Sequence, residues 1–445
     1  MTAPSTDRPS VSIAPGSAPA SAPVPGGAPV VGSVPVRGAA PAPVPASAPV
    51  LGSGSEPEAA PVPVPPSSLP SVSVRPHRPT VTELRLSAFG AHRGAVFAMG
   101  PLTFLAGPSG SGKTTVLRAY ESLARLASGE TAAEVFTDPE ACVPERAVAD
   151  GQSRRGFRIG CTVDGPAGAV RIDLAVQAEP ELRIVGERLS CDGQVLLTTS
   201  LRDPDRPTVQ AAWHTAGPTR VTRVPMPDDR LATALLPLRV SGRTEGELRV
   251  VAAAEQALVA LRSVYACDPH PHRMRLPVAI GEGLLRRDCG NLAEVLRRTR
   301  GECATRHAAL VAAVREGCAG PVESLTAEEL ADGTVRALLG RGGGATMPVG
   351  RLGDGELRYL ALALVLLTGP GVLDVEQDIG VPDAHRTLTV LADGFDRGLD
   401  GRQARALAEL AGRMCARGHI RVLGTIGDAA HADGAAGAAV VDLGA

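Results

Sequence analysis

Gly107-Pro108-Ser109-Gly110-Ser111-Gly112-Lys113-Thr114-Thr115 is the most informative stretch of this chain. It fits the pattern G-x-x-x-x-G-K-[ST], whose glycines let backbone N–H groups converge on phosphate oxygens. In this pattern the lysine reaches the β- and γ-phosphates, and the next hydroxyl, here Thr114, binds Mg²⁺. The stretch therefore predicts a nucleotide-binding loop with an associated magnesium ion.

Lys113 is the only lysine in 445 residues, so 44 of the 45 Lys and Arg residues are arginine. A compact ammonium group fits beside phosphates in a tight loop, whereas the planar guanidinium fork does not. The flanking sequence favours strand, loop and helix over a chance glycine-rich turn. Residues 102–106 form a short apolar run before the loop. Apolar residues recur at helical spacing after it, at Val116, Leu117, Tyr120, Leu123 and Leu126.

Composition divides the chain into two parts. The first 80 residues hold 20 of the 39 prolines, mixed with Ala, Ser, Gly and Val. Such a segment favours polyproline II and cannot bury enough apolar surface to offset its ordering entropy. We predict a disordered arm over residues 1–80, which serves as a spacer or, in a second interpretation, binds a protein partner with a proline-reading groove. Residues 81–445 are predicted to form one α/β domain.

Charge and hydropathy bear on the partners of the protein, and DNA stays a possible partner that they do not support. The net charge of −2 and an aromatic content of 2% give no support for DNA binding. The sequence shows neither a secretory leader nor a run of about 18 apolar residues, so we expect a cytoplasmic protein without a membrane partner.

The cysteines predict neither a disulfide framework nor a zinc site, because the eight are scattered without a C-x-x-C pair. One local cluster, Cys267-Asp268-Pro269-His270-Pro271-His272, is compatible with a metal site. A proline-stiffened loop is the favoured interpretation.

Periodicity predicts several strands and helices. Three strands are expected between residue 81 and the loop, and an antiparallel β lobe over residues 155–199, where Asp-Gly turn signals separate alternating segments. Helical patterns over 248–264, 291–301 and 307–316 predict a helical insertion over residues 230–345. None of these patterns is regular enough for a coiled-coil arm.

Two further clusters follow the insertion. Leu352-Gly353-Asp354-Gly355-Glu356 precedes an apolar helix, whose N-terminus presents free N–H groups. Residues 387–392 form an apolar strand that ends in Asp393. In a parallel sheet this carboxylate emerges at the carboxyl edge beside the loop, where it can hold the water shell of the magnesium ion.

These three clusters, in this order, resemble the nucleotide-binding core of the ABC-type ATPase superfamily. Gly107 to Thr114 are similar to Walker A, Leu352 to Glu356 to the signature loop, and Asp393 to the end of Walker B. Asp400 looks like the aspartate of the D-loop. The long separation of the first two clusters suits the soluble RecF-like and SMC-like branch. The lack of coiled-coil arms suits compact AAA-family ATP-binding proteins.

The resemblance implies an α/β P-loop NTPase core with helices flanking a mixed sheet, ATP and Mg²⁺ as ligands, and ATP held between two copies. Lys113 and Asp393 would be catalytic, Thr114 and Asp393 would hold the metal, and Gly353, Gly355 and Asp400 would contact nucleotide. The family's catalytic glutamate is replaced by Gly394, its signature serine by Gly353 and its switch histidine by Ile426. Other carboxylates or imidazoles lie nearby in sequence, at Asp396, Asp428 and His431.

Three functions remain open. The leading hypothesis is an ATP-dependent dimer clamp or switch with slow hydrolysis, because Gly394 can neither accept a proton from water nor orient it. The second is a non-hydrolysing ATP-binding scaffold that recruits a protein partner. The third is a P-loop small-molecule kinase, which gives no role to residues 352–356 or 393–400.

Overall fold

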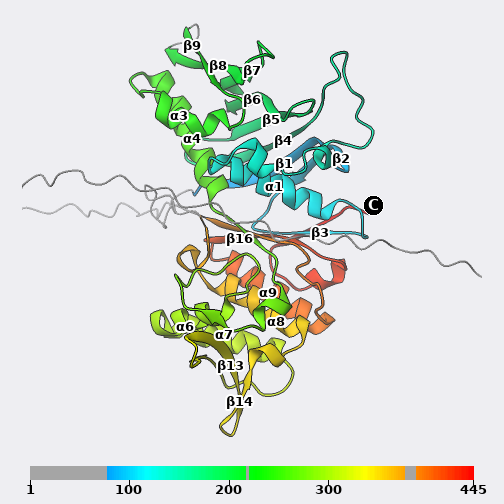
Figure 1. The fold of residues 1–445 in the computed structure, drawn as a ribbon, viewed down its shortest axis with the longest axis vertical. Helices are drawn as coiled ribbons and strands as arrows, with labels where there is room; N and C mark the ends of the chain where they lie inside the picture. The colour runs from blue at the N-terminus through cyan, green and yellow to red at the C-terminus, as the bar shows by residue number, and fades with distance from the viewer. Residues whose placement is uncertain (1–77, 217–219, 376–386, 445) are drawn as a thin grey trace, which may run out of the picture. The chain divides into compact units, whose positions relative to one another are not determined.

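The computed structural model of this chain describes residues 78–216, 220–375 and 387–444. The predicted arm over residues 1–80 therefore lies almost wholly outside the described residues. Figure 1 shows the fold, in which two large sheets are separated by helices.

An eight-stranded antiparallel sheet forms the first layer, with strand order β2-β1-β4-β5-β6-β7-β8-β9. The predicted antiparallel lobe over residues 155–199 corresponds to β4 through β7, and it is extended on both sides by strands from other segments. The strands are β1 (Thr80–Phe89), β2 (His92–Ala98), β4 (Arg155–Asp164), β5 (Val170–Glu179), β6 (Arg183–Cys191), β7 (Gln194–Ser200), β8 (Thr208–Ala216) and β9 (Arg220–Pro227).

A five-stranded sheet with the order β10-β15-β16-β3-β17 forms the second layer, and all its strands are parallel. Every residue of β3 and β15 is buried, as expected for a parallel sheet covered on both faces. The core sheet is thus parallel rather than mixed, because the antiparallel strands form sheets of their own. The strands are β3 (Leu102–Ala106), β10 (Val264–Cys267), β15 (Leu388–Ala392), β16 (Ile420–Thr425) and β17 (Ala438–Asp442).

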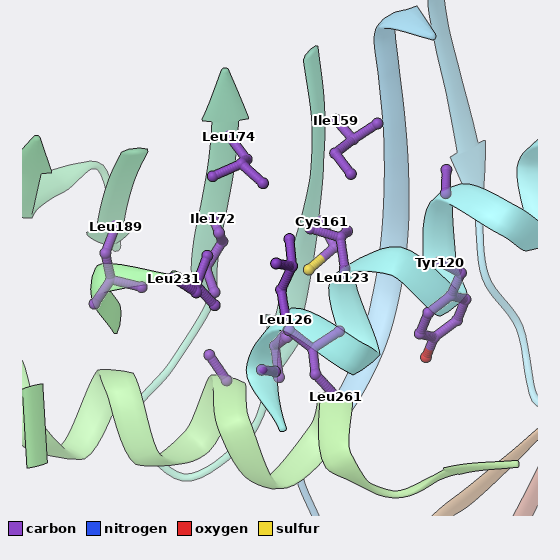
Figure 2. Close-up of a cluster of buried hydrophobic side chains, with 14 of the residues drawn as sticks. Tyr120, Leu123, Leu126, Ile159, Cys161, Ile172, Leu174, Leu189, Leu231 and Leu261 are labelled. Atoms are coloured by element: carbon purple, nitrogen blue, oxygen red, sulfur yellow. The ribbon is translucent and has the colours of Figure 1, made fainter. Parts of the chain in front are cut away.

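Helices α1 (Lys113–Ala127) and α4 (Glu245–Arg262) pack against the antiparallel sheet, and α1 also contacts β10 and β16 of the parallel sheet. The apolar residues spaced along α1 contribute to this core, where Leu123 and Leu126 lie beside side chains from β4 and β5, and Tyr120 lies farther along the helix (Figure 2). Thr244 caps the start of α4 by accepting a hydrogen bond from the Glu247 amide at 3.2 Å. Helix α3 (Ala232–Arg239) packs on α4.

A second core covers the opposite face of the parallel sheet. Alternate residues such as Phe104 and Val390 point into it, whereas Leu105 and Leu391 point toward α1. Its principal helices are α8 (Asp354–Leu367) and α9 (Gly401–Cys415), flanked by α6 (Leu292–Glu302) and α7 (Ala304–Gly317). Short helices α2 (Ala132–Val135) and α5 (Pro271–Met274) complete the set.

The segment over residues 230–345 is only partly helical, which corrects the prediction of a helical insertion. The three expected helices are present as α4, α6 and α7, but β10 joins the parallel sheet. Three of the four strands of a separate antiparallel sheet also lie in it. Strands β11 and β14 escaped prediction because they are short and β12 because it is polar, whereas β13 has nine residues with alternating burial and was missed because the segment was interpreted as helical. The strands are β11 (Val278–Ala279), β12 (Ser324–Glu329), β13 (Thr334–Gly342) and β14 (Ala345–Pro348).

Helix length and hydropathy also bear on membranes. Within the described ranges, none of the helices is both long enough and apolar enough to span a bilayer.

Candidate functional site

The loop 107–112 joins β3 to α1, as the sequence predicts. Gly112 has a φ of +89°, a left-handed conformation that side chains rarely adopt. A Cβ atom built on Gly112 would lie 2.5 Å from Nε2 of His92, which donates a hydrogen bond to the Gly112 carbonyl at 3.0 Å. Glycine is therefore required here both by its backbone angle and by the close approach of His92, a contact that the sequence did not indicate.

Lys113 folds back over its own loop. Its Nζ donates hydrogen bonds to the carbonyls of Gly107 at 2.5 Å and Pro108 at 2.9 Å. The hydroxyl of Ser111 is buried and has no hydrogen-bond partner among the described residues. A buried hydroxyl without a partner is rare in proteins. Lys113 can thus exchange its carbonyl partners for a ligand, and the Ser111 hydroxyl can form a hydrogen bond with a phosphate oxygen.

The register of the parallel sheet brings three polar residues to one level. Cys267, Ala392 and Gly424 are aligned on neighbouring strands, so the residues that follow them, Asp268, Asp393 and Thr425, emerge together at the carboxyl edge. Strand β3, which pairs with β16, delivers the loop 107–112 to the same edge. This arrangement is the usual location of ligands in open parallel sheets.

Asp393 faces the start of α1, as the sequence predicts. The Thr114 hydroxyl lies 3.2 Å from both carboxylate oxygens of Asp393, and the Thr425 hydroxyl donates to Oδ1 at 2.8 Å. Thr425 in turn accepts a hydrogen bond from the Gly394 amide at 2.6 Å. A hydroxyl and a carboxylate facing each other are oxygen ligands of the kind that Mg²⁺ binds, and Mg²⁺ keeps its remaining positions for water and phosphate. The residues present therefore fit a magnesium ion.

Two arginines at this edge were missed by the sequence reasoning. Arg358 of α8 is buried and donates to the carbonyls of Pro269 at 2.5 Å and Gly394 at 3.0 Å. Arg397 lies within 3.7 Å of Asp393 and 3.6 Å of Asp268. One signal was available for Arg358, since it is the one charged residue in the apolar run 357–367, and such a residue is seldom buried without partners.

The position after Asp393 supplies no carboxylate. Gly394 has a φ of +61°, and a Cβ atom built on it would lie 2.6 Å from Nε of Arg397. The space next to the strand end is therefore taken by a guanidinium group.

The nearby alternative carboxylates and imidazole are engaged with one another. Asp396 accepts hydrogen bonds from the Gly427 amide at 2.8 Å and from Nδ1 of His431 at 2.8 Å. Asp428 accepts from the Ala430 amide at 2.9 Å, which caps the short turn that carries His431. Ile426, which stands where the resemblance places a switch histidine, is buried in the core below the parallel sheet. These residues hold the segment after β16 in place.

Residues 352–356 lie against a different part of the same chain. Arg275 donates to the Leu352 carbonyl and pairs with Asp354, both at 2.8 Å. Glu356 accepts from the Gly353 amide at 3.0 Å. A Cβ atom on Gly355 would lie 2.2 Å from the Gly398 carbonyl, so this glycine permits direct packing on the segment that follows Asp393.

Asp400 has a structural partner as well. Its side chain accepts a hydrogen bond from the Gln403 amide at 2.7 Å and so caps helix α9. The predicted nucleotide contacts outside the loop thus interact with other parts of the same protomer; they are Gly353, Gly355 and Asp400. No hydrogen bond or ion pair among the described residues links them to the loop 107–115.

The cysteine and histidine cluster at 267–272 is a packed turn. Cys267 and Cys289 are buried with their sulfur atoms 3.9 Å apart. The hydrogen bond with Cys267 and burial hold the pKa of Cys289 well above its usual range, and a protonated thiol is a poor metal ligand. His270 contacts the carbonyl of Asp268 through Nδ1 at 2.8 Å. Within the described part of the chain, no three His, Cys, Asp or Glu side chains are grouped to hold a metal ion.

Comparisons with known proteins give distant structural likeness only. No protein-family model and no curated protein matches the sequence. An SMC head bound to the C-winged helix domain of ScpA is 12% identical with a TM-score of 0.44, covering 80% of this chain and 92% of that chain. An SMC head domain from Thermotoga maritima is 10% identical with a TM-score of 0.38, covering 80% of this chain and 92% of that chain.

A third solved structure is the Smc head domain with an extended coiled coil bound to the C-terminal domain of ScpA, derived from Pyrococcus furiosus. It is 9% identical with a TM-score of 0.42, covering 79% of this chain and 91% of that chain. Scores and identities this low leave the function to be inferred from the residues.

Proposed function

We propose that this protein is a P-loop ATPase that binds Mg-ATP and acts as an ATP-dependent dimer clamp or switch with slow hydrolysis. The observation that carries the proposal is the placement of the Thr114 hydroxyl 3.2 Å from Asp393, two residues far apart in sequence. This pair stands beside a glycine-rich loop whose lysine is held only by backbone carbonyls. The same edge of the sheet thus supplies ligands for phosphate and for a divalent cation.

Each residue of the site has a distinct role in binding. Lys113 exchanges the carbonyls of Gly107 and Pro108 for the β- and γ-phosphates, and the Ser111 hydroxyl gains a phosphate partner. Thr114 and Asp393 hold the magnesium ion, which supplies charge neutralisation at the phosphates when bound. Thr425 fixes the orientation of Asp393 through its hydrogen bond to Oδ1. These contacts position the phosphates, and positioning is the main protein contribution to phosphoryl transfer.

Slow hydrolysis follows from the residues that would orient water. Gly394 has no side chain, and Asp396 already accepts hydrogen bonds from His431 and Gly427. A general base must reach the attacking water directly or through one further water. Without such a base, the loop 107–112, Lys113 and the metal ion would accelerate hydrolysis only through positioning and electrostatic stabilisation.

The segment 393–400 can transmit nucleotide occupancy to helix α8. One end carries Asp393 beside Thr114, and Gly398 near the other end packs directly on Gly355. Asp400 then anchors the segment to α9. Movement of Asp393 on metal binding would therefore shift residues 352–356. We propose that these residues contact the loop 107–115 of a second copy.

A non-hydrolysing ATP-binding scaffold is the second candidate. The left-handed backbone at Gly394 and the buried side chain of Ile426 favour it, because both positions lack the groups that drive turnover.

A single-turnover experiment on the full chain tests both functions. Radiolabelled Mg-ATP would be followed with wild type, Lys113→Ala and Arg118→Ala, an exposed residue on the same helix that serves as control. Slow, Lys113-dependent conversion, with a mass increase in ATP but not ADP by light scattering, supports the clamp. ATP that is bound and retained supports the scaffold. Transfer to an added acceptor, or an ATP affinity that Lys113→Ala leaves unchanged, would refute both. The variant Gly394→Glu is unsuitable because it strains the backbone and meets Arg397.

A further inference from the structure

Arg397 places a positive charge beside Asp393, one of the two residues that we propose hold the metal ion. A hydrogen bond from its amide to the Gly394 carbonyl at 3.0 Å closes the turn after β15 and returns the side chain to the strand end. Its Nη2 is 3.7 Å from Asp393 Oδ2, and its Nη1 is 3.6 Å from Asp268 Oδ1. The guanidinium of Arg397 therefore lies between two carboxylates at the carboxyl edge of neighbouring strands, and Asp268 Oδ1 is also 3.4 Å from Nη1 of Arg358.

Arg358, the second arginine at this edge, bonds the backbone here, whereas the side chain of Arg397 pairs with carboxylates. The Arg358 side chain is 6% exposed and bonds the carbonyls of Pro269, Asp393 and Gly394. The Arg397 side chain is 55% exposed, and both of its ion pairs are longer than a normal hydrogen bond. Such pairs are worth little individually and break readily.

We propose that the Arg397 guanidinium beside Asp393 competes with the divalent metal for this carboxylate. With Arg397 in place, the charge of Asp393 is neutralised and a free metal ion gains little by binding. A bound triphosphate offers Arg397 an alternative anion, so that it can leave Asp393 as the metal arrives. Metal and nucleotide would then bind together rather than separately. This inference rests on the proposed function, because it assigns the metal to Thr114 and Asp393.

Binding of Mn²⁺ without nucleotide tests the inference independently of activity. Free Mn²⁺ would be measured by electron paramagnetic resonance with the full chain as wild type, Arg397→Ala, Arg397→Lys and Arg405→Ala. Arg405 is an exposed arginine on α9 and controls for general loss of positive charge. We expect Arg397→Ala to bind Mn²⁺ roughly three- to tenfold tighter than wild type, and Arg397→Lys and Arg405→Ala to remain near wild type.

Two results would overturn the competition. The first is unchanged Mn²⁺ affinity in Arg397→Ala, and the second is an equal gain in Arg405→Ala. A gain that persists in Arg397→Ala/Asp393→Asn would also overturn it, since the metal would then lie elsewhere. ATP binding by wild type and Lys113→Ala, measured on the same preparations, distinguishes failure of the role of Arg397 from failure of the proposed function. Lys113-dependent ATP binding with unchanged Mn²⁺ affinity refutes only the role of Arg397, whereas absent ATP binding refutes the proposed function as well.

Discussion

The antiparallel sheet and the carboxyl edge of the parallel sheet both contain charged residues, but they satisfy them differently. In the antiparallel sheet Arg85 is 5% exposed and donates to Asp173 at 3.1 Å, to Thr162 at 2.6 Å and to two carbonyls. At the carboxyl edge Lys113 bonds only its own loop, and Arg397 is held by two long ion pairs.

The difference separates structural from functional charge. A buried ion with every donor used resists replacement of its partners, because any unpaired group would pay its full desolvation cost. A partly exposed ion on weak or backbone partners can exchange them for a ligand at small cost. Variants in the first region should therefore change stability, and variants in the second should change ligand binding.

The largest effect is expected for Arg85→Ala. Its loss removes a buried guanidinium that bonds Asp173, Glu83, Thr162 and two carbonyls, so the free energy of unfolding should fall by about 3–4 kcal/mol. Urea denaturation measures this change. The control is Arg171→Ala, which removes an exposed arginine that pairs with the same Asp173 at 2.7 Å and should cost less than about 1 kcal/mol. Equal losses in the two variants would remove the distinction between buried and exposed charge.

Lys113→Ala should give the converse pattern. We expect ATP affinity to fall by about 2 kcal/mol, roughly thirtyfold, through loss of charge-assisted hydrogen bonds to phosphate. The free energy of unfolding should change by less than about 0.5 kcal/mol, because the lysine bonds only the carbonyls of its own loop. Calorimetric titration and urea denaturation measure the two quantities. A large loss of stability would show that Lys113 belongs with the structural charges.

Glu187 of the antiparallel sheet allows a test by pH. It is buried and accepts hydrogen bonds from the amides of Ala232 at 2.6 Å and Thr233 at 2.8 Å, at the start of α3. Burial raises its pKa, although the hydrogen bonds from Thr233 and Ala232 oppose the shift. In Glu187→Gln the amide nitrogen cannot accept one of these bonds, which should cost about 1–2 kcal/mol.

The advantage of wild type over Glu187→Gln should depend on pH in one direction. Since the folded pKa is raised, the advantage is fully present below the unfolded pKa of glutamate and declines as the pH rises through the folded value. Urea denaturation of both proteins between about pH 4 and 8 follows this trend. An advantage that grows with pH would show that the hydrogen bonds outweigh burial.

The smallest expected effect concerns Gly394→Ala. A methyl group at a φ of +61° that meets the flexible end of Arg397 should cost about 1 kcal/mol of stability. The matched control is Gly301→Ala, in helix α6, where a Cβ atom meets no neighbour within 4 Å and alanine should stabilise by about 0.5–1 kcal/mol. Thermal unfolding compares the two, and stabilisation by both would show that position 394 is not strained.

Local sequence patterns predicted the elements around the loop. An apolar run before Gly107 and helical spacing after Lys113 indicated β3 and α1, and the strand that ends at Asp393 was expected as well. Strands β10 to β14 were not expected. Strands β10 and β11 are short and pair with segments distant in sequence, whereas β12, β13 and β14 pair with near neighbours that the helical interpretation of residues 230–345 left out. Nucleotide binding by these residues stays a prediction.

The sequence by itself determined the loop pattern, the lone lysine and the strand that presents Asp393, because each depends on a few consecutive residues. Only the tertiary structure decided which groups meet. The alignment of β10, β15 and β16 brings Asp268, Asp393 and Thr425 to one level. The packing of α8 places Arg358 at this edge, where it donates to the Gly394 carbonyl. Pairing of distant strands sets these contacts, and no local pattern encodes strand order or register across so many intervening residues.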